Sequence, residues 1–426
     1  MARHADVPEL ACFSKYDSKF RWAARPWSAQ ILLIKNWEST VKDASFTIAA
    51  NSDEYQDICH SIETICERFP AKYWRDLEDA PLTARYPEDF VKTLEQSGFL
   101  SPLLPQDFGG VGLPIGAVAK IVETIHACGG NGSVFIMQNR LLQLLVKYAG
   151  EDIKRDIFPR IASGAARLQS LAVFEPHARD NIEQMKTRAV KTTNGWMING
   201  RKRWVHYVDK SDFMLLAARS GEEPYDISLF LVDMEKHRGG AIQWELIDGM
   251  NNNGGAEIVL KDLELTEKSV VGTLNGGTTC LDGSQAVESI LTAAAAYGDT
   301  RFFSRKATSY AKERVVFGNP IGKYQGVQFP IARAYIESQG AEIVLKLAIA
   351  LEDAGLDSRS EAMVAQHLAA NAAWDAADTA FSTHGGFAFA REYDIERKWR
   401  EVRAMRNAVA GALPRIAELV LGLPHG

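Results

Sequence analysis

The chain contains 426 residues, of which 46% are hydrophobic and 24% are charged, a balance typical of a globular protein with two or three domains. Its formal net charge of -6 argues against nucleic acid as the main partner, because binding along a phosphate backbone requires an excess of basic residues. A phosphate-bearing cofactor is compatible with this charge, since such a ligand needs only local donors.

The cysteines and histidines indicate neither a metal site nor a disulfide framework. The cysteines number 5, no two form a C-x-x-C pair, and the histidines show no H-E-x-x-H spacing. No apolar run approaches the length of a membrane span, and the first ten residues lack the apolar segment of a signal peptide. We therefore expect a cytoplasmic protein without a metal ion or a membrane span.

Residues 1–51 show no clear periodicity, and we treat them as an N-terminal extension of unknown role. From residue 52 the pattern becomes helical. In "EYQDICHSIETICERF" apolar residues recur every three or four positions, as on one face of a helix. "YPEDFVKTLEQSGF", "IGAVAKIVETIHACG" and "SVFIMQNRLLQLLVKYAG" follow, each closed by a glycine. The sequence thus predicts an N-terminal helical domain over residues 52–166.

Residues 167–275 change to an alternating pattern. Short segments such as "RLQSLAVFE", "WMINGRKRWVHYV" and "DISLFLVDM" are rich in β-branched and aromatic residues, with turn residues between them. Asn194-Gly195 and Asn199-Gly200 are dipeptides typical of hairpins. We predict an antiparallel β domain here.

Residues 276–426 are helical again. Four long segments, which begin near residues 284, 327, 360 and 392, are joined by short connections and predict a four-helix bundle. The expected fold class is therefore α+β and multi-domain, in the order helical domain, β domain, helical bundle.

Two glycine-containing segments are candidates for ligand binding. "GGVGLPIG" at 109–116 is not a dinucleotide loop, because no strand precedes it and its glycine spacing is wrong. In "YAKERVVFGNPIGKYQ", Arg314 and Phe317 are three residues apart and are predicted to share a helix face that the next glycine ends. Arg314 is then either a phosphate ligand or a surface arginine beside a helix end.

The strand "RKRWVHYV" is expected to place Trp204 and His206 on one face, with Arg203 and Val205 on the other. An indole beside a polar ring is suited to forming the wall of an aromatic cofactor site. Ordinary packing of a half-buried sheet explains the same pattern.

The apolar run "AVESILTAAAAYGD" at 286–299 carries one carboxylate, Glu288, near its start. A first-turn carboxylate interacts favourably with the helix dipole, which is one explanation for it. A general base is the other.

Together these segments resemble the acyl-CoA dehydrogenase family over roughly residues 52–424. The resemblance rests on the segments "GFLSPLLPQDFGGVGL", "FEPHARDN", "INGRKRWV", "YAKERVVFGNPIGKYQGVQFPIA" and "HGGFAFAREYDIERKWREVR". It implies an FAD-dependent enzyme that removes the α proton of an acyl thioester, on CoA or a carrier protein, while the β hydrogen passes to flavin N5 as hydride. It also implies a homodimer or homotetramer with FAD at the subunit interface, and an electron-transfer flavoprotein or another electron acceptor.

By this resemblance, two groups of residues bind FAD. The flavin ring is expected to lie against Val173, Phe174, Trp204 and His206. The diphosphate and adenosine half of the FAD of the neighbouring subunit is expected to contact Arg314, Phe317, Gln325, Gly385 and Gly386.

The resemblance also decides between the two explanations for Glu288. Many members of the family carry the base after the last arginine motif, where this chain has "RNAVAGAL", with Val409, Ala410 and Gly411 and no acid. A minority, which includes isovaleryl-CoA dehydrogenase, takes the base from the first long helix of the bundle. Counting back from Gly298, Glu288 falls on that position, and we predict that it is the catalytic base.

Several positions depart from the family pattern. Phe174 replaces a threonine, His206 replaces a small hydroxyl residue, and Ser382 replaces a glutamine near the Gly-Gly pair. Arg179, Asp180 and Asn181 replace a Gly-Ser-Asp stretch, and Ser289 replaces an arginine that often follows the base.

These departures leave two other functions open. One is the same fold used by a flavin monooxygenase, or by a non-redox enzyme of specialised metabolism with weakened or lost flavin binding. The other is a non-catalytic partner subunit.

Overall fold

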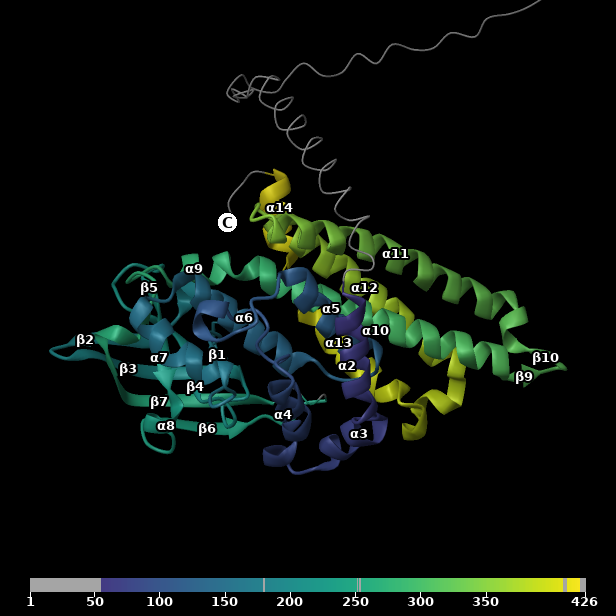
Figure 1. Ribbon diagram of the computed structural model, residues 1–426, viewed down its shortest axis with the longest axis horizontal. Helices are drawn as coiled ribbons and strands as arrows, with labels where there is room; N and C mark the ends of the chain where they lie inside the picture. The colour runs from purple at the N-terminus through teal and green to yellow at the C-terminus, as the bar shows by residue number, and fades with distance from the viewer. Residues whose placement is uncertain (1–54, 179–180, 251, 253, 409–411, 422–426) are drawn as a thin grey trace, which may run out of the picture. The chain divides into compact units, whose positions relative to one another are not determined.

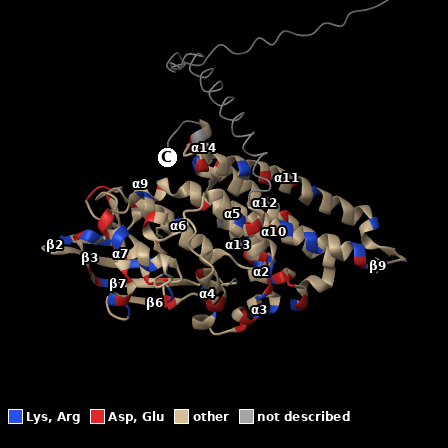
Figure 2. Ribbon diagram, in the orientation of Figure 1, with Lys and Arg blue, Asp and Glu red and all other residues tan. Residues whose placement is uncertain are grey.

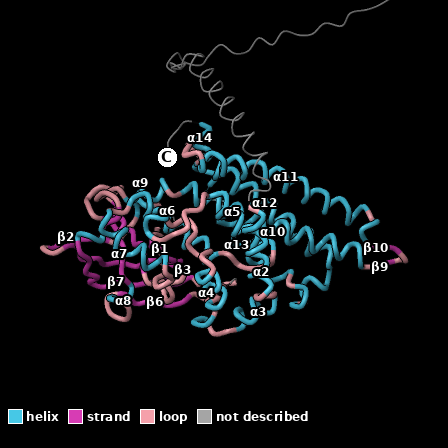
Figure 3. The backbone as a smooth tube through the Cα atoms, in the orientation of Figure 1, coloured by secondary structure: helices cyan, strands magenta, loops and turns pink. Residues whose placement is uncertain are grey.

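The computed structural model describes residues 55–178, 181–250, 252, 254–408 and 412–421. Helices precede and follow a single large sheet, so the predicted order of helical, β and helical regions is confirmed (Figure 1). The strands of the large sheet gather on one side of the described chain, and long helices make up the other side (Figure 3). The N-terminal extension that we assigned to residues 1–51 lies outside the described residues.

Among the described residues, six α-helices precede the sheet. They are α2 (Gln56–Glu67), α3 (Ala71–Asp79), α4 (Glu88–Gln96), α5 (Ile115–Ala127), α6 (Ser133–Tyr148) and α7 (Glu151–Ala162). Helix α5 is buried on nearly all sides, because almost every residue that it contains is apolar or small. The other helices pack one apolar face and expose polar residues on the opposite face.

The large sheet has eight strands. They are β1 (Leu168–Ala172), β2 (Arg188–Thr192), β3 (Gly195–His206), β4 (Phe213–Arg219), β5 (Ile227–Asp233), β6 (Ile242–Leu246), β7 (Gly255–Thr266) and β8 (Val270–Val271). Their order is β6-β7-β3-β2-β4-β5-β8, and β1 pairs with β4 beside this path.

The predicted antiparallel pairing holds for most of the sheet, but the sheet is mixed. β1 and β2 both run parallel to β4. Alternation within one strand shows that the strand is half-buried but carries no information on the direction of its neighbour, which explains why the sequence missed these pairs. One apolar face of the sheet packs against α6 and α7, where residues such as Leu145, Phe158 and Leu215 are fully buried.

The C-terminal region is built around helix α10 (Gln285–Glu313). Its neighbours along the chain are α9 (Gly277–Gly283), α11 (Gln325–Asp353), α12 (Arg359–His384), α13 (Ile395–Ala408) and α14 (Ala412–Leu421). The fourth helix of the predicted bundle is therefore described as two, α13 and α14, and the short α9 was not predicted. Residues 409–411 lie outside the described residues.

Small residues allow the helices around α10 to approach closely. Ala293–Ala296 are fully buried, and a Cβ at Gly298 would lie 2.3 Å from the Glu123 carbonyl oxygen of α5. Replacing Gly298 would therefore force α5 and α10 apart. The alanine-rich run that the sequence indicated as a buried helix is the centre of the helical core, and its first turn carries Glu288.

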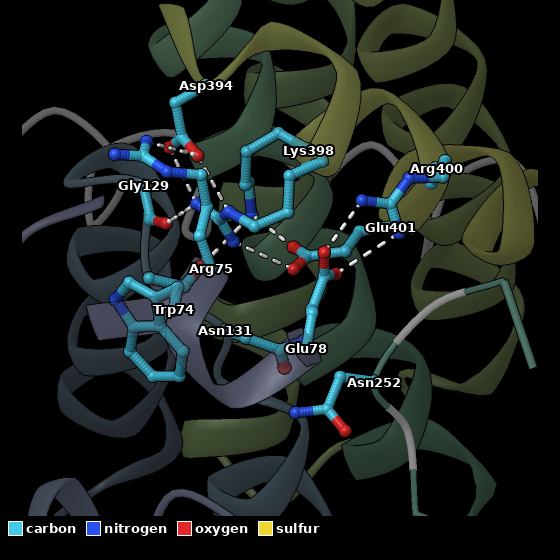
Figure 4. A network of polar contacts seen from close by, with 12 residues as sticks. Trp74, Arg75, Glu78, Gly129, Asn131, Asn252, Asp394, Lys398, Arg400 and Glu401 are labelled. Carbon is cyan, nitrogen blue, oxygen red and sulfur yellow. Dashed lines mark hydrogen bonds and ion pairs between the residues drawn. The ribbon is translucent and has the colours of Figure 1, made fainter. Parts of the chain in front are cut away.

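A buried network of charges connects α13 with α10 and with the loop that follows α5. Figure 4 shows the part of it around Lys398, Glu401 and Asp394. The Lys398 ammonium lies 2.6 Å from Asp299 and 2.7 Å from Glu401, and it donates to the Gly130 carbonyl oxygen at 3.0 Å. Arg397 donates to Asp394 and Glu401 from the same helix. These side chains are 8% exposed or less, so each charge depends on its partners in place of water.

Acidic and basic residues are mixed over both the sheet and the helices (Figure 2). None of the helices that the structure describes combines the length and the apolar character needed to cross a lipid bilayer.

Candidate functional site

The predicted base, Glu288, lies in the first turn of α10, where its backbone N–H donates to the Ser284 carbonyl oxygen at 3.3 Å. Its Oε1 lies 2.7 Å from Nη1 of Arg140 on α6, and the two side chains are 25% and 19% exposed. The carboxylate is therefore held in place and still accessible to a ligand, as a proton acceptor must be. The sequence did not predict Arg140 as a site residue, because periodicity within α10 does not reveal that Glu288 has a partner on another helix.

The four residues expected to face a flavin ring lie together at the end of β1 and along β3. The backbone N–H of Arg203 donates to the Phe174 carbonyl oxygen at 2.9 Å, and the Lys202 ammonium donates to the Val173 carbonyl oxygen at 3.1 Å. These bonds place Val173 and Phe174 beside the segment that carries Trp204 and His206.

Strand β3 is irregular at Trp204. This residue has a φ of 58°, and the pairing of β3 with β7 shifts between Lys202 and Val205. Trp204 and His206 both lie beside Gly255 of β7, where an added Cβ would be 3.5 Å from the indole and 4.0 Å from the imidazole. Because the register shifts, Arg203 and Trp204 are both exposed while Val205 is buried, so the predicted strict alternation does not hold at this point.

A buried ion pair that the sequence did not indicate fixes this wall. The Lys202 ammonium is 3.0 Å from Glu175, and Glu175 also accepts hydrogen bonds from the backbone N–H groups of Lys186 and Thr187. Burial lowers the pKa of Lys202 to about 8, and the neighbouring Glu175 opposes this shift. The pair anchors the segment that contains Val173 to β3.

The wall presents two large aromatic faces to the surface. Phe174 is 46% exposed and Trp204 is 51% exposed, although most aromatic side chains of the sheet are buried. Exposed rings that are close together and held by a rigid strand are suited to packing against another aromatic group.

The predicted position of Phe317 on a helix face is wrong. Helix α10 ends at Glu313, and Phe317 lies in the turn between two short strands, β9 (Val315–Val316) and β10 (Asn319–Pro320). Phe317 and Gly318 have φ values of 50° and 74°, as in the tight turns of β-hairpins. Two adjacent valines favour a strand over a further helical turn, which is the physical reason for the early end of α10.

Arg314 and the Gly385-Gly386 pair lie at the same end of the bundle. The Arg314 guanidinium lies 5.9 Å from the centre of the Phe387 ring, directly after the two glycines. Among the residues that the structure describes, it has no carboxylate within ion-pair distance. Gly385 has a φ of 58°, and a Cβ at either glycine would meet nothing within 4 Å, so the backbone is open to a ligand.

The remaining residue of this group, Gln325, begins α11 and is exposed. The β9–β10 hairpin and the 3₁₀ turn Ile321–Lys323 connect it to Arg314. The structure therefore brings the second group of predicted residues to one region, as a ligand site requires.

The two groups lie at opposite ends of the bundle. Helix α10 has 29 residues, which corresponds to a length of about 43 Å, with Glu288 in its first turn and Arg314 just past its last. In Figure 1 the β9–β10 hairpin lies at the far end of α10 from the large sheet. One subunit alone therefore does not bring all of the predicted residues to one reacting centre.

His384, which precedes the two glycines, predicts a loss of stability in acid. Burial lowers its pKa, the hydrogen bond from Nδ1 to the Ala380 carbonyl oxygen opposes this, and Lys306 reinforces it. The unfolded chain gains this proton near pH 6.5 and the folded protein only at lower pH, so the unfolded state binds more protons in between. The free energy of unfolding is therefore expected to decrease as the pH falls below about 6.5.

Urea unfolding between pH 5 and pH 7 tests this expectation. The His384→Gln variant should show a smaller decrease than the parent protein, because glutamine does not titrate. Equal decreases in the two proteins would contradict the prediction.

The other departures from the family pattern are placed as follows. Asn181 accepts a hydrogen bond from the Glu183 N–H, Ser382 is exposed on α12, and Ser289 is fully buried and donates to Gln366. Arg179 and Asp180 lie outside the described residues, as do Val409, Ala410 and Gly411.

Comparison with known protein families gives three matches along the chain. Residues 52–165 match the acyl-CoA dehydrogenase N-terminal domain, residues 170–263 match the middle domain, and residues 275–411 match the C-terminal domain. The 3-(aryl)acrylate reductase of Clostridium sporogenes is 27% identical over 331 residues, which cover 77% of this chain and 88% of that protein. The acyl-CoA dehydrogenase FadE12 of Mycobacterium tuberculosis is 28% identical over 339 residues, which cover 77% of this chain and 86% of that protein.

Solved structures share the fold. A glutaryl-coenzyme A dehydrogenase in complex with glutaryl-CoA superposes with a TM-score of 0.79 at 20% identity, covering 88% of this chain and 96% of that one. PigA with FAD and proline superposes with a TM-score of 0.77 at 20% identity, covering 87% and 98%.

Proposed function

The chain belongs to the acyl-CoA dehydrogenase family, whose members use FAD to oxidise acyl thioesters, and we propose that Glu288 is the base of this reaction in the present protein. The observation that carries the proposal is the position of Glu288. It is a partly exposed carboxylate at the head of the central helix, and a cation on a second helix holds it. An acyl thioester, on CoA or on a carrier protein, is the proposed substrate.

The residues present fit FAD in two places. The exposed rings of Phe174 and Trp204 offer flat faces for an isoalloxazine, and His206 lies on the same wall beside Gly255. At the other end of the bundle, the unpaired Arg314 and the open backbone of Gly385 are suited to a diphosphate. When bound, FAD supplies an acceptor for the β hydrogen and its electron pair.

The protein's own part in the reaction is proton transfer and positioning. Because Arg140 contacts Oε1, the other carboxylate oxygen, Oε2, is the one that remains to take the α proton. The Lys202–Glu175 pair holds the wall in place, so that a ring system packed on it has a fixed position. The apolar rings of the wall exclude water from that face of the bound ring system.

We also propose a homodimer or homotetramer in which Arg314, Phe317, Gln325, Gly385 and Gly386 serve the FAD of a neighbouring subunit. The length of α10 supports this, since one subunit keeps these residues far from Glu288. Helix α11 supports it as well, because Phe329, Tyr335, Ile336 and Ile343 are between 60% and 66% exposed on its surface. An electron-transfer flavoprotein or another acceptor would reoxidise the flavin.

The absorption spectrum of the purified protein is the first test. The proposal expects a flavin spectrum that loses its colour when a saturated acyl-CoA is added without oxygen, from a panel that includes butyryl-, isovaleryl- and 3-phenylpropionyl-CoA. A protein that binds no flavin, even when refolded or expressed with excess FAD, would exclude the proposed reaction. Turnover that requires oxygen and prior reduction of the flavin would indicate a monooxygenase.

Arg314→Gln is expected to weaken FAD binding about 10- to 100-fold, because it removes a charge-assisted hydrogen bond to the diphosphate. The dissociation constant can be measured by titrating apoprotein with FAD and following flavin fluorescence. Lys312→Gln is a matched control, since it removes an exposed positive charge from the same helix end. Equal FAD affinity in both variants would contradict the assignment of Arg314.

A further inference from the structure

Arg140 has a contact that the fold does not require. Its Nη1 lies 2.7 Å from Glu288, and its Nε is buried with no hydrogen-bond partner among the described residues. A guanidinium has five donors, so Arg140 uses little of its capacity for the protein itself. A guanidinium that is 19% exposed and makes so few hydrogen bonds lowers the stability of the fold. We therefore expect its one partner to be functionally important.

Other residues supply the structural anchors of this part of α6. Gln138 accepts a hydrogen bond from the Leu168 N–H of β1, and Asn139 donates to the Leu100 carbonyl oxygen. Leu141 and Leu144, which are fully or almost fully buried, fix the helix against the sheet. The helix is thus held on both sides of Arg140 by groups that do not involve its guanidinium.

The other charged groups near the head of α10 do not contact Glu288. Lys147, two helical turns beyond Arg140, donates to the Gly283 carbonyl oxygen. Arg415 of α14 donates to Gln285 and lies 3.5 Å from Asp282. Within the described residues, Arg140 is therefore the cation that neutralises the proposed base.

The residue next to the base does not supply this cation. Ser289 is fully buried, and its hydroxyl group is directed to Gln366 of α12. Because Ser289 is uncharged and faces the bundle, a positive charge beside Glu288 has to come from another element. Arg140 of α6 provides it from across the helix interface.

We propose that Arg140 is a positioning residue for the base: by holding Oε1 of Glu288, it fixes the carboxylate in one orientation and leaves Oε2 facing the substrate. The proposal rests on the function proposed above. Holding one oxygen limits the rotamers of a side chain that would otherwise be mobile, and a displacement of about 1 Å in a catalytic group can cost about 100-fold in rate. The positive charge also compensates for the loss of water around a carboxylate that is three-quarters buried.

The test uses three variants of the FAD-bound enzyme and follows exchange of the α proton of a saturated acyl-CoA in D₂O by NMR. Arg140→Gln removes the charge, Arg140→Lys keeps it but loses the planar fork, and Lys147→Gln removes a positive charge two turns away on α6. Arg140→Gln is expected to lower the rate at saturating substrate about 100-fold with little change in KM. Arg140→Lys should exchange the α proton about tenfold faster than Arg140→Gln, and Lys147→Gln should exchange it at the parental rate.

The separate effects on rate, KM and thermal stability distinguish positioning from a purely structural role. In Arg140→Gln the loss should fall on the rate at saturating substrate and be partly restored in Arg140→Lys, because only the orientation of the carboxylate has changed. A loss of thermal stability with an unchanged rate would show that the pair is only structural. An increase in KM alone would show that Arg140 binds substrate, and either result would overturn the proposal.

A measurement without turnover distinguishes failure of this proposal from failure of the proposed function. The Glu288 carboxylate can be observed by carbon-13 NMR in selectively labelled protein and assigned by its loss in Glu288→Gln. Its chemical shift should change in Arg140→Gln, which removes the contact at Oε1, and stay at the parental value in Lys147→Gln. A chemical shift that does not respond to Arg140→Gln would refute the pairing. A normal response in a protein that does not exchange the α proton of any acyl-CoA would refute only the function.

Discussion

Glu288→Gln is expected to lower the rate of α-proton exchange about 100- to 10,000-fold, which is the usual contribution of a general base. Glutamine has nearly the same shape as glutamate, and its amide oxygen can still accept a hydrogen bond from Arg140, but it cannot take up the proton. The fold and the FAD content should therefore remain unchanged. Proton exchange in D₂O measures the effect directly, because it does not require the hydride to be transferred.

Asp282→Asn is the matched control for this prediction. Asp282 is a carboxylate at the same end of the bundle, but its side chain is 59% exposed and pairs with Arg415. The control should exchange protons at the parental rate. Exchange at that rate in Glu288→Gln would mean that another group is the base.

Lys398→Met is expected to lower the free energy of unfolding by about 3–5 kcal/mol, the largest stability effect that we predict. The substitution leaves Asp299 and Glu401 buried without their shared cation. Burial acts to raise the pKa of Asp299, but His126 and Lys398 outweigh it and hold the pKa below its usual range. Loss of Lys398 removes one of these two stabilising partners. Urea unfolding followed by circular dichroism measures the difference.

An exposed ion pair provides the comparison. Lys72 and Asp76 lie 2.6 Å apart on α3, with side chains 75% and 59% exposed, so Lys72→Met should change stability by less than about 1 kcal/mol. The double variant Asp299→Asn, Lys398→Met should recover part of the lost free energy of unfolding. It removes one of the two buried carboxylates that no longer pair with Lys398. Equal stability of Lys398→Met and Lys72→Met would show that the buried network is not held by Lys398.

The sequence predicted well those features that depend on local pattern. The alanine run of α10 indicated a buried helix, and the structure places Ala293–Ala296 at the centre of the core. The position of Glu288 at the head of that helix followed from the same pattern together with the family resemblance. Trp204 was expected on a strand beside His206, and it lies in β3, although its backbone conformation was not predicted. Its contact with a flavin stays a prediction.

Features that depend on distant parts of the chain were not predicted. Arg140 and Glu288 are on different helices, and Glu175 and Lys202 are separated by a strand and a hairpin. No periodicity within one element reveals such pairs, because they are set by the packing of elements against each other. The end of α10 was missed for a local reason: the three-residue spacing of Arg314 and Phe317 matches a helix, but the two valines between them favour a strand.

The length of α10 has a consequence for how this chain can vary. The helix rises about 1.5 Å and turns about 100° with each residue, so one inserted or deleted residue in its middle would rotate its two ends relative to each other. If Arg314 kept its place, Glu288 would then turn away from Arg140, and if Glu288 kept its place, Arg314 would turn instead. Substitutions among the small buried residues of α10 alter packing, but inserting or deleting a residue changes the relative orientation of Glu288 and Arg314, and with it both proposed ligand contacts. Insertions and deletions should therefore be far rarer in this helix than in the loops on either side of it.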